Sequence, residues 1–173
     1  MTAIVTKAIG APKTKTKDLA VQITLMYIEI EKHENVVEEL IKGFDQKNPK
    51  IVCACVSALV LALREFGSKV INLKALVKKI PSLLQDRDKT VRDEAKLLTV
   101  EIFRWIGPVF KTQIASLPAV VLTELETEFD KVKSDKAVPT RYLRSQQAKQ
   151  VQQAAAIGAG EMEDCEGKRL LSF

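Results

Sequence analysis

Apolar residues recur along the chain at the spacing of one face of an α-helix. The first such series is Leu19, Ile23, Met26, Tyr27 and Ile30. Residues 52–63 repeat this spacing, and further long helices are expected over about 90–106 and 118–133. Shorter amphipathic segments lie near 2–9, 36–44 and 73–84. Because no strand-like alternation of useful length occurs, the pattern predicts an all-α chain in which short and long helices alternate.

The chain also resembles itself after a shift of 40 residues. The shift pairs polar and glycine positions as well as apolar ones: Asn48 with Asp88, Ile51 with Val91, Cys55 with Ala95, Arg64 with Arg104 and Gly67 with Gly107. A period of about 40 residues in paired helices is typical of an α-solenoid of the HEAT or armadillo type. A bundle of unrelated amphipathic helices is the alternative. Since the first repeat begins within a unit, we expect an apolar, exposed face at the N-terminal end.

Composition narrows the function classes. With 173 residues, 46% of them hydrophobic, the chain suits one globular domain. The longest apolar run, residues 51–63, is shorter than the roughly 20 residues of a membrane span. One histidine and three cysteines form no catalytic or metal-binding motif. We therefore expect no enzyme activity, no cofactor, no metal and no membrane partner.

Basic residues gather where the long helices begin. The net charge is only +5, but the clusters recur with the repeat: Lys13, Lys15 and Lys17; Lys47 and Lys50; Arg87, Lys89 and Arg92. Bases at a helix N-terminus oppose the macrodipole, so their recurrence there indicates function rather than stability. In a solenoid these loops would line one edge. The basic excess is low for nucleic acid, and the aromatic residues, Tyr27 among them, fall on apolar faces typical of a core. An acidic protein is therefore the expected partner.

Several segments together resemble the TOG domain of microtubule polymerases, and are most similar to the first TOG domain of the Mini spindles / ch-TOG family. They are the basic segments at 11–17 and 48–50, and the stretches 88–95, 100–106, 25–32 and 140–147. The resemblance covers about residues 3–147. It implies a HEAT-repeat α-solenoid without enzyme activity or cofactor. It also implies a protein of the cytoplasm and cytoskeleton, found at microtubules, the centrosome and the spindle.

In that family, loops inside each of six HEAT repeats bind the curved αβ-tubulin heterodimer, and arrays of such domains act at microtubule plus ends. The resemblance assigns tubulin binding here to loops of the third, fourth and fifth repeats. The residues concerned are Lys13, Lys15, Lys17, Lys50, Lys89 and Arg92.

The chain departs from the family at its start. By comparison with the family pattern, we expect this sequence to lack the first two HEAT repeats, including the loop whose tryptophan anchors β-tubulin. Trp105 lies late in a long helix and does not replace that tryptophan. We expect residues 1–133 to form a partial TOG domain of the third to sixth repeats, and 134–173 to form a linker and a mostly disordered tail. A HEAT-repeat adaptor for another acidic protein, or an inactive fragment, are the alternatives. The oligomeric state and the role of residues 148–173 stay open.

Overall fold

A computed structural model describes residues 1–115, 117–132 and 137–148, and this part of the chain contains helices and connections but no strand. Of the linker and mostly disordered tail predicted for residues 134–173, residues 134–136 and 149–173 lie outside the described residues. The elements, with η marking a π-helical turn, are η1 (Ile4–Ala8), α1 (Thr14–Tyr27), η2 (Ile28–Lys32), α2 (His33–Gly43), α3 (Pro49–Phe66), α4 (Leu73–Leu84), α5 (Lys89–Ile106), α6 (Phe110–Gln113) and α7 (Ala119–Val132).

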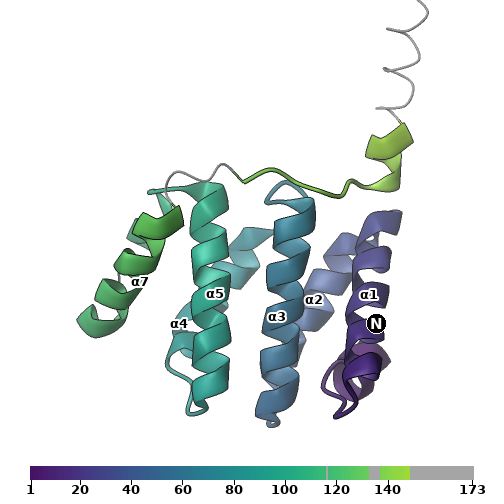
Figure 1. Ribbon diagram of the computed structural model, residues 1–173, viewed down its shortest axis with the longest axis horizontal. Helices are drawn as coiled ribbons and strands as arrows, with labels where there is room; N and C mark the ends of the chain where they lie inside the picture. Colours follow the sequence, from purple (N-terminus) through teal and green to yellow (C-terminus); the bar gives the residue numbers. More distant parts are fainter. Residues whose placement is uncertain (116, 133–136, 149–173) are drawn as a thin grey trace, which may run out of the picture.

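The helices form two layers (Figure 1). Helices α1, α3, α5 and α7 stand side by side in one row, and α2 and α4 lie behind it. Helix α3 packs on α5 and α2, and α5 also packs on α4 and α7. Helices α3 and α5 are both 18 residues long, and they begin at Pro49 and Lys89, the offset that the sequence repeat predicts. The predicted all-α, HEAT-type solenoid is confirmed.

Equivalent glycines end the two central helices. Gly67 follows α3 with φ 80°, and Gly107 follows α5 with φ 79°. At these φ values with extended ψ, an L side chain is strained, so glycine is required. The amide of Gly67 donates to the Leu63 carbonyl, as that of Gly107 donates to Phe103. The two glycines differ in their surroundings. A Cβ at Gly67 would lie 2.8 Å from the ring of Trp105, whereas a Cβ at Gly107 would have no atom within 4 Å.

Small residues allow α2 and α3 to approach closely. A Cβ at Gly43 would lie 2.5 Å from the Cys55 sulfur, so only glycine fits opposite this thiol. Cys55 is fully buried, as are Leu59 and Leu63 in the same helix. Burial raises the pKa of the Cys55 thiol to about 12. The predicted role of Cys55 as a small core residue is thus confirmed.

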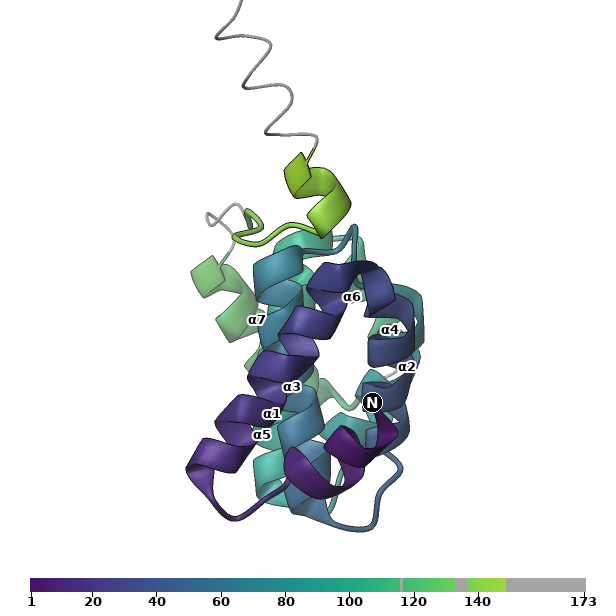
Figure 2. The ribbon, with the colours of Figure 1, turned by 90° about the vertical axis from the view of Figure 1, so that its right-hand side faces the viewer.

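Helix α1 corrects one expectation. The apolar series that the sequence predicts on one helix face is exposed: the exposed fractions are 62% for Leu19, 40% for Ile23 and 57% for Met26, with Tyr27 and Ile30 similar. The buried face of α1 instead carries Ala20, Thr24 and Leu25, and Ile28 at the start of η2 is buried as well. Because α1 is the end helix of the row, it has packed neighbours on one side only (Figure 2). The placement of Tyr27 on a core face was therefore wrong, whereas the expected exposed apolar face at the N-terminal end is present.

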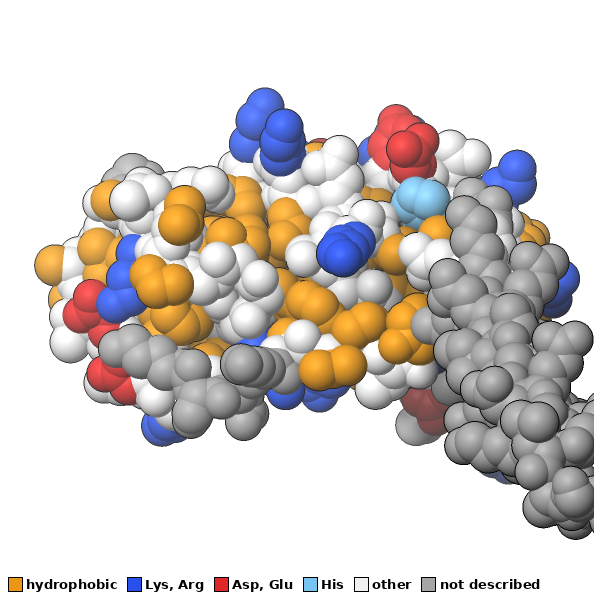
Figure 3. Space-filling model, turned by 90° about the horizontal axis from the view of Figure 1, so that it is seen from above, with side chains coloured by type: hydrophobic (Ala, Val, Ile, Leu, Met, Phe, Trp, Pro, Cys, Tyr) orange, Lys and Arg blue, Asp and Glu red, His pale blue; other side chains and the backbone are white. Residues whose placement is uncertain are grey.

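Part of the predicted linker crosses the row of helices. Residues 137–148 run over the upper ends of α5 and α3 toward α1 (Figure 1). The amides of Thr140 and Arg141 both donate to the Glu65 carbonyl, each at 2.9 Å. The Arg141 guanidinium forms ion pairs with Glu65 at 3.0 Å and Glu29 at 3.4 Å. Seen from this end, hydrophobic side chains gather between isolated basic ones (Figure 3). This crossing segment therefore connects the end of α3 with η2, which follows α1.

Candidate functional site

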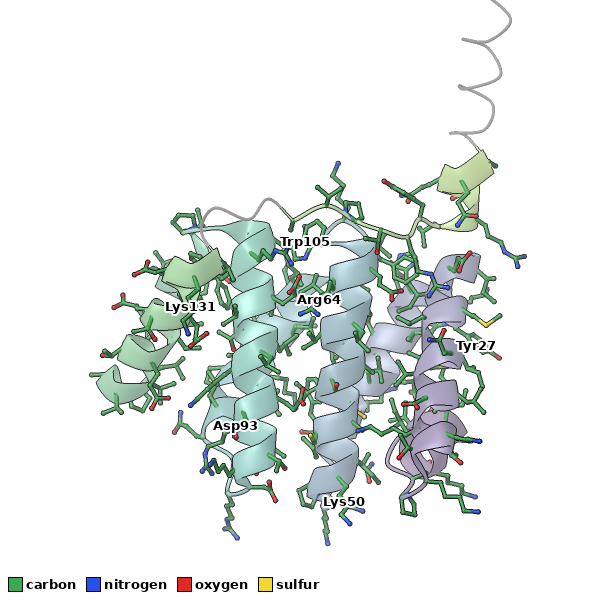
Figure 4. The ribbon with its side chains drawn as sticks, in the orientation of Figure 1. Tyr27, Lys50, Arg64, Asp93, Trp105 and Lys131 are labelled. Carbon is green, nitrogen blue, oxygen red and sulfur yellow. The ribbon has the colours of Figure 1, made fainter. Side chains whose placement is uncertain are left out.

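Three loops lie together at one end of the row of helices. They comprise residues 9–13, 44–48 and 85–88, and they lead into α1, α3 and α5 at the lower edge of Figure 1. We call this end the loop edge. Lys50, at the start of α3, is labelled at the loop edge in Figure 4. Segments that are far apart in the sequence thus share one edge because successive HEAT-type units stack in the same orientation.

The six residues that the resemblance assigned to partner binding all lie at this edge. They occupy the cap or first turn of α1 (Lys13, Lys15 and Lys17), of α3 (Lys50) and of α5 (Lys89 and Arg92). The four lysines at 13, 15, 50 and 89 are exposed, and Lys17 is half-buried. None of the five ammonium groups forms an ion pair or hydrogen bond with another described residue. Their charges are therefore available to a partner.

Arg92 has a different environment. Its Nη1 donates to the carbonyl oxygens of Asp86 at 2.7 Å and Arg87 at 2.9 Å. Hydrogen bonds from a charged donor to two backbone acceptors are stronger than neutral ones. Arg92 thus holds the loop between α4 and α5 in shape, in addition to placing positive charge at the edge.

Helix caps fix the same two loops. The side-chain oxygen of Asn48 accepts from the Lys50 amide at 3.0 Å, and that of Asp88 accepts from the Thr90 amide at 2.8 Å. Such caps satisfy amides that have no partner within the helix. The hydroxyl of Thr90, followed by its amide, lowers the pKa of the Asp88 carboxyl. An ionised Asp88 at the start of α5 interacts favourably with the helix dipole and locally offsets Lys89.

A hollow of about 620 Å³ separates the second and third loops. Its walls come from the α2–α3 loop and the start of α3 on one side, and from the end of α4 and the α4–α5 loop on the other. Lys47 and Arg87 line it. The sequence showed both residues in the basic clusters, but the motif match did not include them. Only the folded arrangement shows that they border one space.

The remaining chemistry of the described residues is limited. They contain no group of three or more His, Cys, Asp or Glu side chains that could hold a metal ion. Burial raises the pKa of the Cys53 thiol as well as that of Cys55, which makes both poor nucleophiles near neutral pH. No described helix is long and apolar enough to cross a membrane. Trp105 is half-buried, and its indole N–H donates to the Glu101 carboxylate at 3.1 Å.

Comparison with known proteins identifies relatives of this chain. It is 64% identical over 156 residues to Protein mini spindles of Drosophila melanogaster, and 37% identical over 153 residues to Centrosomal protein 224 of Dictyostelium discoideum. These matches cover 90% and 88% of this chain but only 8% of either relative. The chain therefore corresponds to a small part of such proteins.

Solved structures show the same fold. The third TOG domain of Drosophila Mini spindles matches with a TM-score of 0.73 and 22% identity, over 81% of this chain and 61% of that one. A structure of tubulin recruitment by microtubule polymerases with TOG domain arrays matches with a TM-score of 0.79 and 21% identity, over 89% of this chain and 33% of that one. The family model of the XMAP215/Dis1/CLASP TOG domain matches residues 1–129. This chain belongs to the XMAP215/Dis1/CLASP TOG domain family.

Proposed function

We propose that this chain binds the αβ-tubulin heterodimer through the loop edge, as a module of a microtubule plus-end polymerase and without catalysis. The observation that carries the proposal is the convergence of lysines from three successive repeats, none with an internal partner among the described residues. Tubulin has an acidic surface, which is complementary to these charges. The fold shared with a structure of tubulin recruitment supports the same partner.

The proposed cellular location rests on the same family relationship. Relatives of this chain are named for the mitotic spindle and the centrosome. A module that captures tubulin would act in the cytoplasm, at microtubule plus ends and at spindle poles. This proposal concerns the part of the larger proteins to which the chain corresponds.

The position of the charges distinguishes tubulin capture from a HEAT-type adaptor. An adaptor for an extended acidic peptide would use the faces of the helices, whereas the unpaired lysines lie in caps and first turns at the loop edge. Exposed charges steer association and are screened over roughly 10 Å at moderate ionic strength. Binding through them should therefore weaken steeply as salt is added.

A titration of the full chain with αβ-tubulin at low and moderate salt tests the proposal. The variant Lys50→Glu/Lys89→Glu reverses two charges at the loop edge. Lys74→Glu/Lys78→Glu is the control, because it changes the net charge equally on exposed positions of α4. We expect about tenfold weaker binding for the first variant and less than about twofold for the control. Equal affinities for the two variants, with circular dichroism unchanged, would reject the loop edge as the binding site.

A further inference from the structure

The hollow between the second and third loops has a rigid frame. Next to the lining residue Gln46 in the chain, the Asp45 carboxylate pairs with the Lys79 ammonium at 2.8 Å and so connects the α2–α3 loop to α4. On the other side, Arg92 holds the backbone of the α4–α5 loop. Asn48 and Asp88 cap the two helices that begin there. Because these contacts already fix both loops, an occupant would not have to order them.

Most acceptors around the hollow are already engaged. The Asp86 carboxylate accepts from the Asp88 amide at 2.8 Å, and Asp88 accepts from the amide and hydroxyl of Thr90. The carbonyls of Asp86 and Arg87 accept from Arg92. The Ser82 hydroxyl donates to the Lys79 carbonyl at 2.7 Å. The acidic residues lining the hollow are thus used to build the loop.

The donors around the hollow are free. Lys47 lies on the wall from the α2–α3 loop, and Arg87 on the wall from the α4–α5 loop. Both side chains are exposed, and neither forms an ion pair or hydrogen bond with a described residue. Gln46 and Gln85 add uncharged amides to the same lining. The space therefore offers two cations from opposite walls to an occupant that supplies acceptors.

We infer that this hollow receives a projecting acidic turn of the bound protein, with a carboxylate held between Lys47 and Arg87. The inference rests on the proposed function, and it adds a specific pocket and two residues that the motif match did not include. A guanidinium can hold a carboxylate through two hydrogen bonds, while an ammonium adapts as a point charge. The hollow thus fixes the register of the partner, whereas the lysines around it steer the approach.

This division of roles has a kinetic consequence. Exposed charges at the rim of an interface act mainly on the association rate, and charge pairs enclosed in the complex act mainly on dissociation. Reversing Lys47 and Arg87 should therefore speed dissociation of the partner. Reversing Lys50 and Lys89 should chiefly slow association.

The first experiment measures association and dissociation rates of αβ-tubulin on the full chain. It compares Lys47→Glu/Arg87→Glu with Lys50→Glu/Lys89→Glu and with the control Lys74→Glu/Lys78→Glu, which all change the net charge equally. We expect at least about tenfold faster dissociation for the hollow variant alone. If the hollow variant behaves like the control while Lys50→Glu/Lys89→Glu weakens binding, the inference is overturned and the proposed function stands. If no variant weakens binding, both fall.

A second experiment tests the space rather than the charge. Gln85→Trp places a large neutral side chain in the lining, and Gln113→Trp, at an exposed position of α6, is its control. We expect Gln85→Trp to weaken tubulin binding about tenfold or more, and Gln113→Trp to leave it unchanged. Equal binding by the two variants, both folded by circular dichroism, would show that nothing enters the hollow. Thermal unfolding of each variant identifies any that fails to fold.

Discussion

The Arg92 guanidinium lies 2.7 Å from the carbonyl oxygen of Asp86, so a residue assigned to partner binding also holds its own loop. The second hydrogen bond, to the Arg87 carbonyl at 2.9 Å, comes from the same nitrogen. Loss of tubulin binding in an Arg92 variant would therefore combine a lost charge with a changed loop. Lys50 and Lys89, which have no such contacts, report the charge alone.

Replacing Arg92 by alanine should cost stability, because two backbone carbonyls lose a charged donor. We expect a loss of about 1–3 kcal/mol in the free energy of unfolding, measured with urea. Lys89→Ala, one turn earlier and exposed, should stay within about 0.5 kcal/mol of the parent. If both variants unfold at the same urea concentration, the hydrogen bonds of Arg92 contribute nothing measurable.

The two glycines that end α3 and α5 form a matched pair. Both have positive φ, but only Gly67 faces the Trp105 ring, since nothing lies within 4 Å of a Cβ at Gly107. Gly107→Ala should cost about 1–3 kcal/mol from backbone strain alone. Gly67→Ala should cost distinctly more, because the new methyl group also displaces Trp105. Equal losses in urea unfolding would mean that Trp105 moves aside without cost, which indole fluorescence would detect.

The exposed apolar stripe on α1 should govern self-association rather than stability. Leu19→Lys/Met26→Lys should leave the free energy of unfolding within about 0.5 kcal/mol and reduce concentration-dependent association. The control is Leu25→Ala, on the buried face of α1, which should cost about 2–5 kcal/mol. Sedimentation velocity and urea unfolding measure the two effects. A large loss of stability in the double lysine variant would show that the stripe is buried in solution.

The buried thiol of Cys55 predicts a pH dependence. Its pKa of about 12 in the folded chain exceeds the usual 9.0, so the unfolded chain releases this proton at lower pH. Stability from Cys55 is then complete below pH 9 and is lost as the pH rises above it, at up to about 1.4 kcal/mol per pH unit. In Cys55→Ala, the part of the decrease in the free energy of unfolding between pH 8.5 and 10.5 that comes from this thiol should disappear. A constant difference between parent and variant over that range would contradict the assignment.

Much of the helical architecture was predictable because it depends on local interactions. The sequence repeat that relates α3 to α5 extends to their capping residues, Asn48 and Asp88, and to the glycines that follow both helices. The spacing of apolar residues favours a helix before any tertiary contact is known. The position of the lysines at helix starts follows from the same pattern. Their gathering on one edge required only that the repeats stack.

Tertiary structure alone decided which surfaces were covered. The apolar series on α1 has the spacing of a core face, yet it is exposed because α1 ends the row and packs through Ala20 and Leu25 instead. The orientation of the Arg92 side chain depends on the backbone carbonyls of the α4–α5 loop that accept its hydrogen bonds. The existence of the hollow depends on how α4 and the two loops are arranged around it. By itself the sequence determined the helices, their repeat and the placement of charge, which are set by near neighbours in the chain. The tertiary structure decided which side chains are buried, which are paired and where a cavity forms. Each of these depends on residues that are distant in the sequence but neighbouring in the fold.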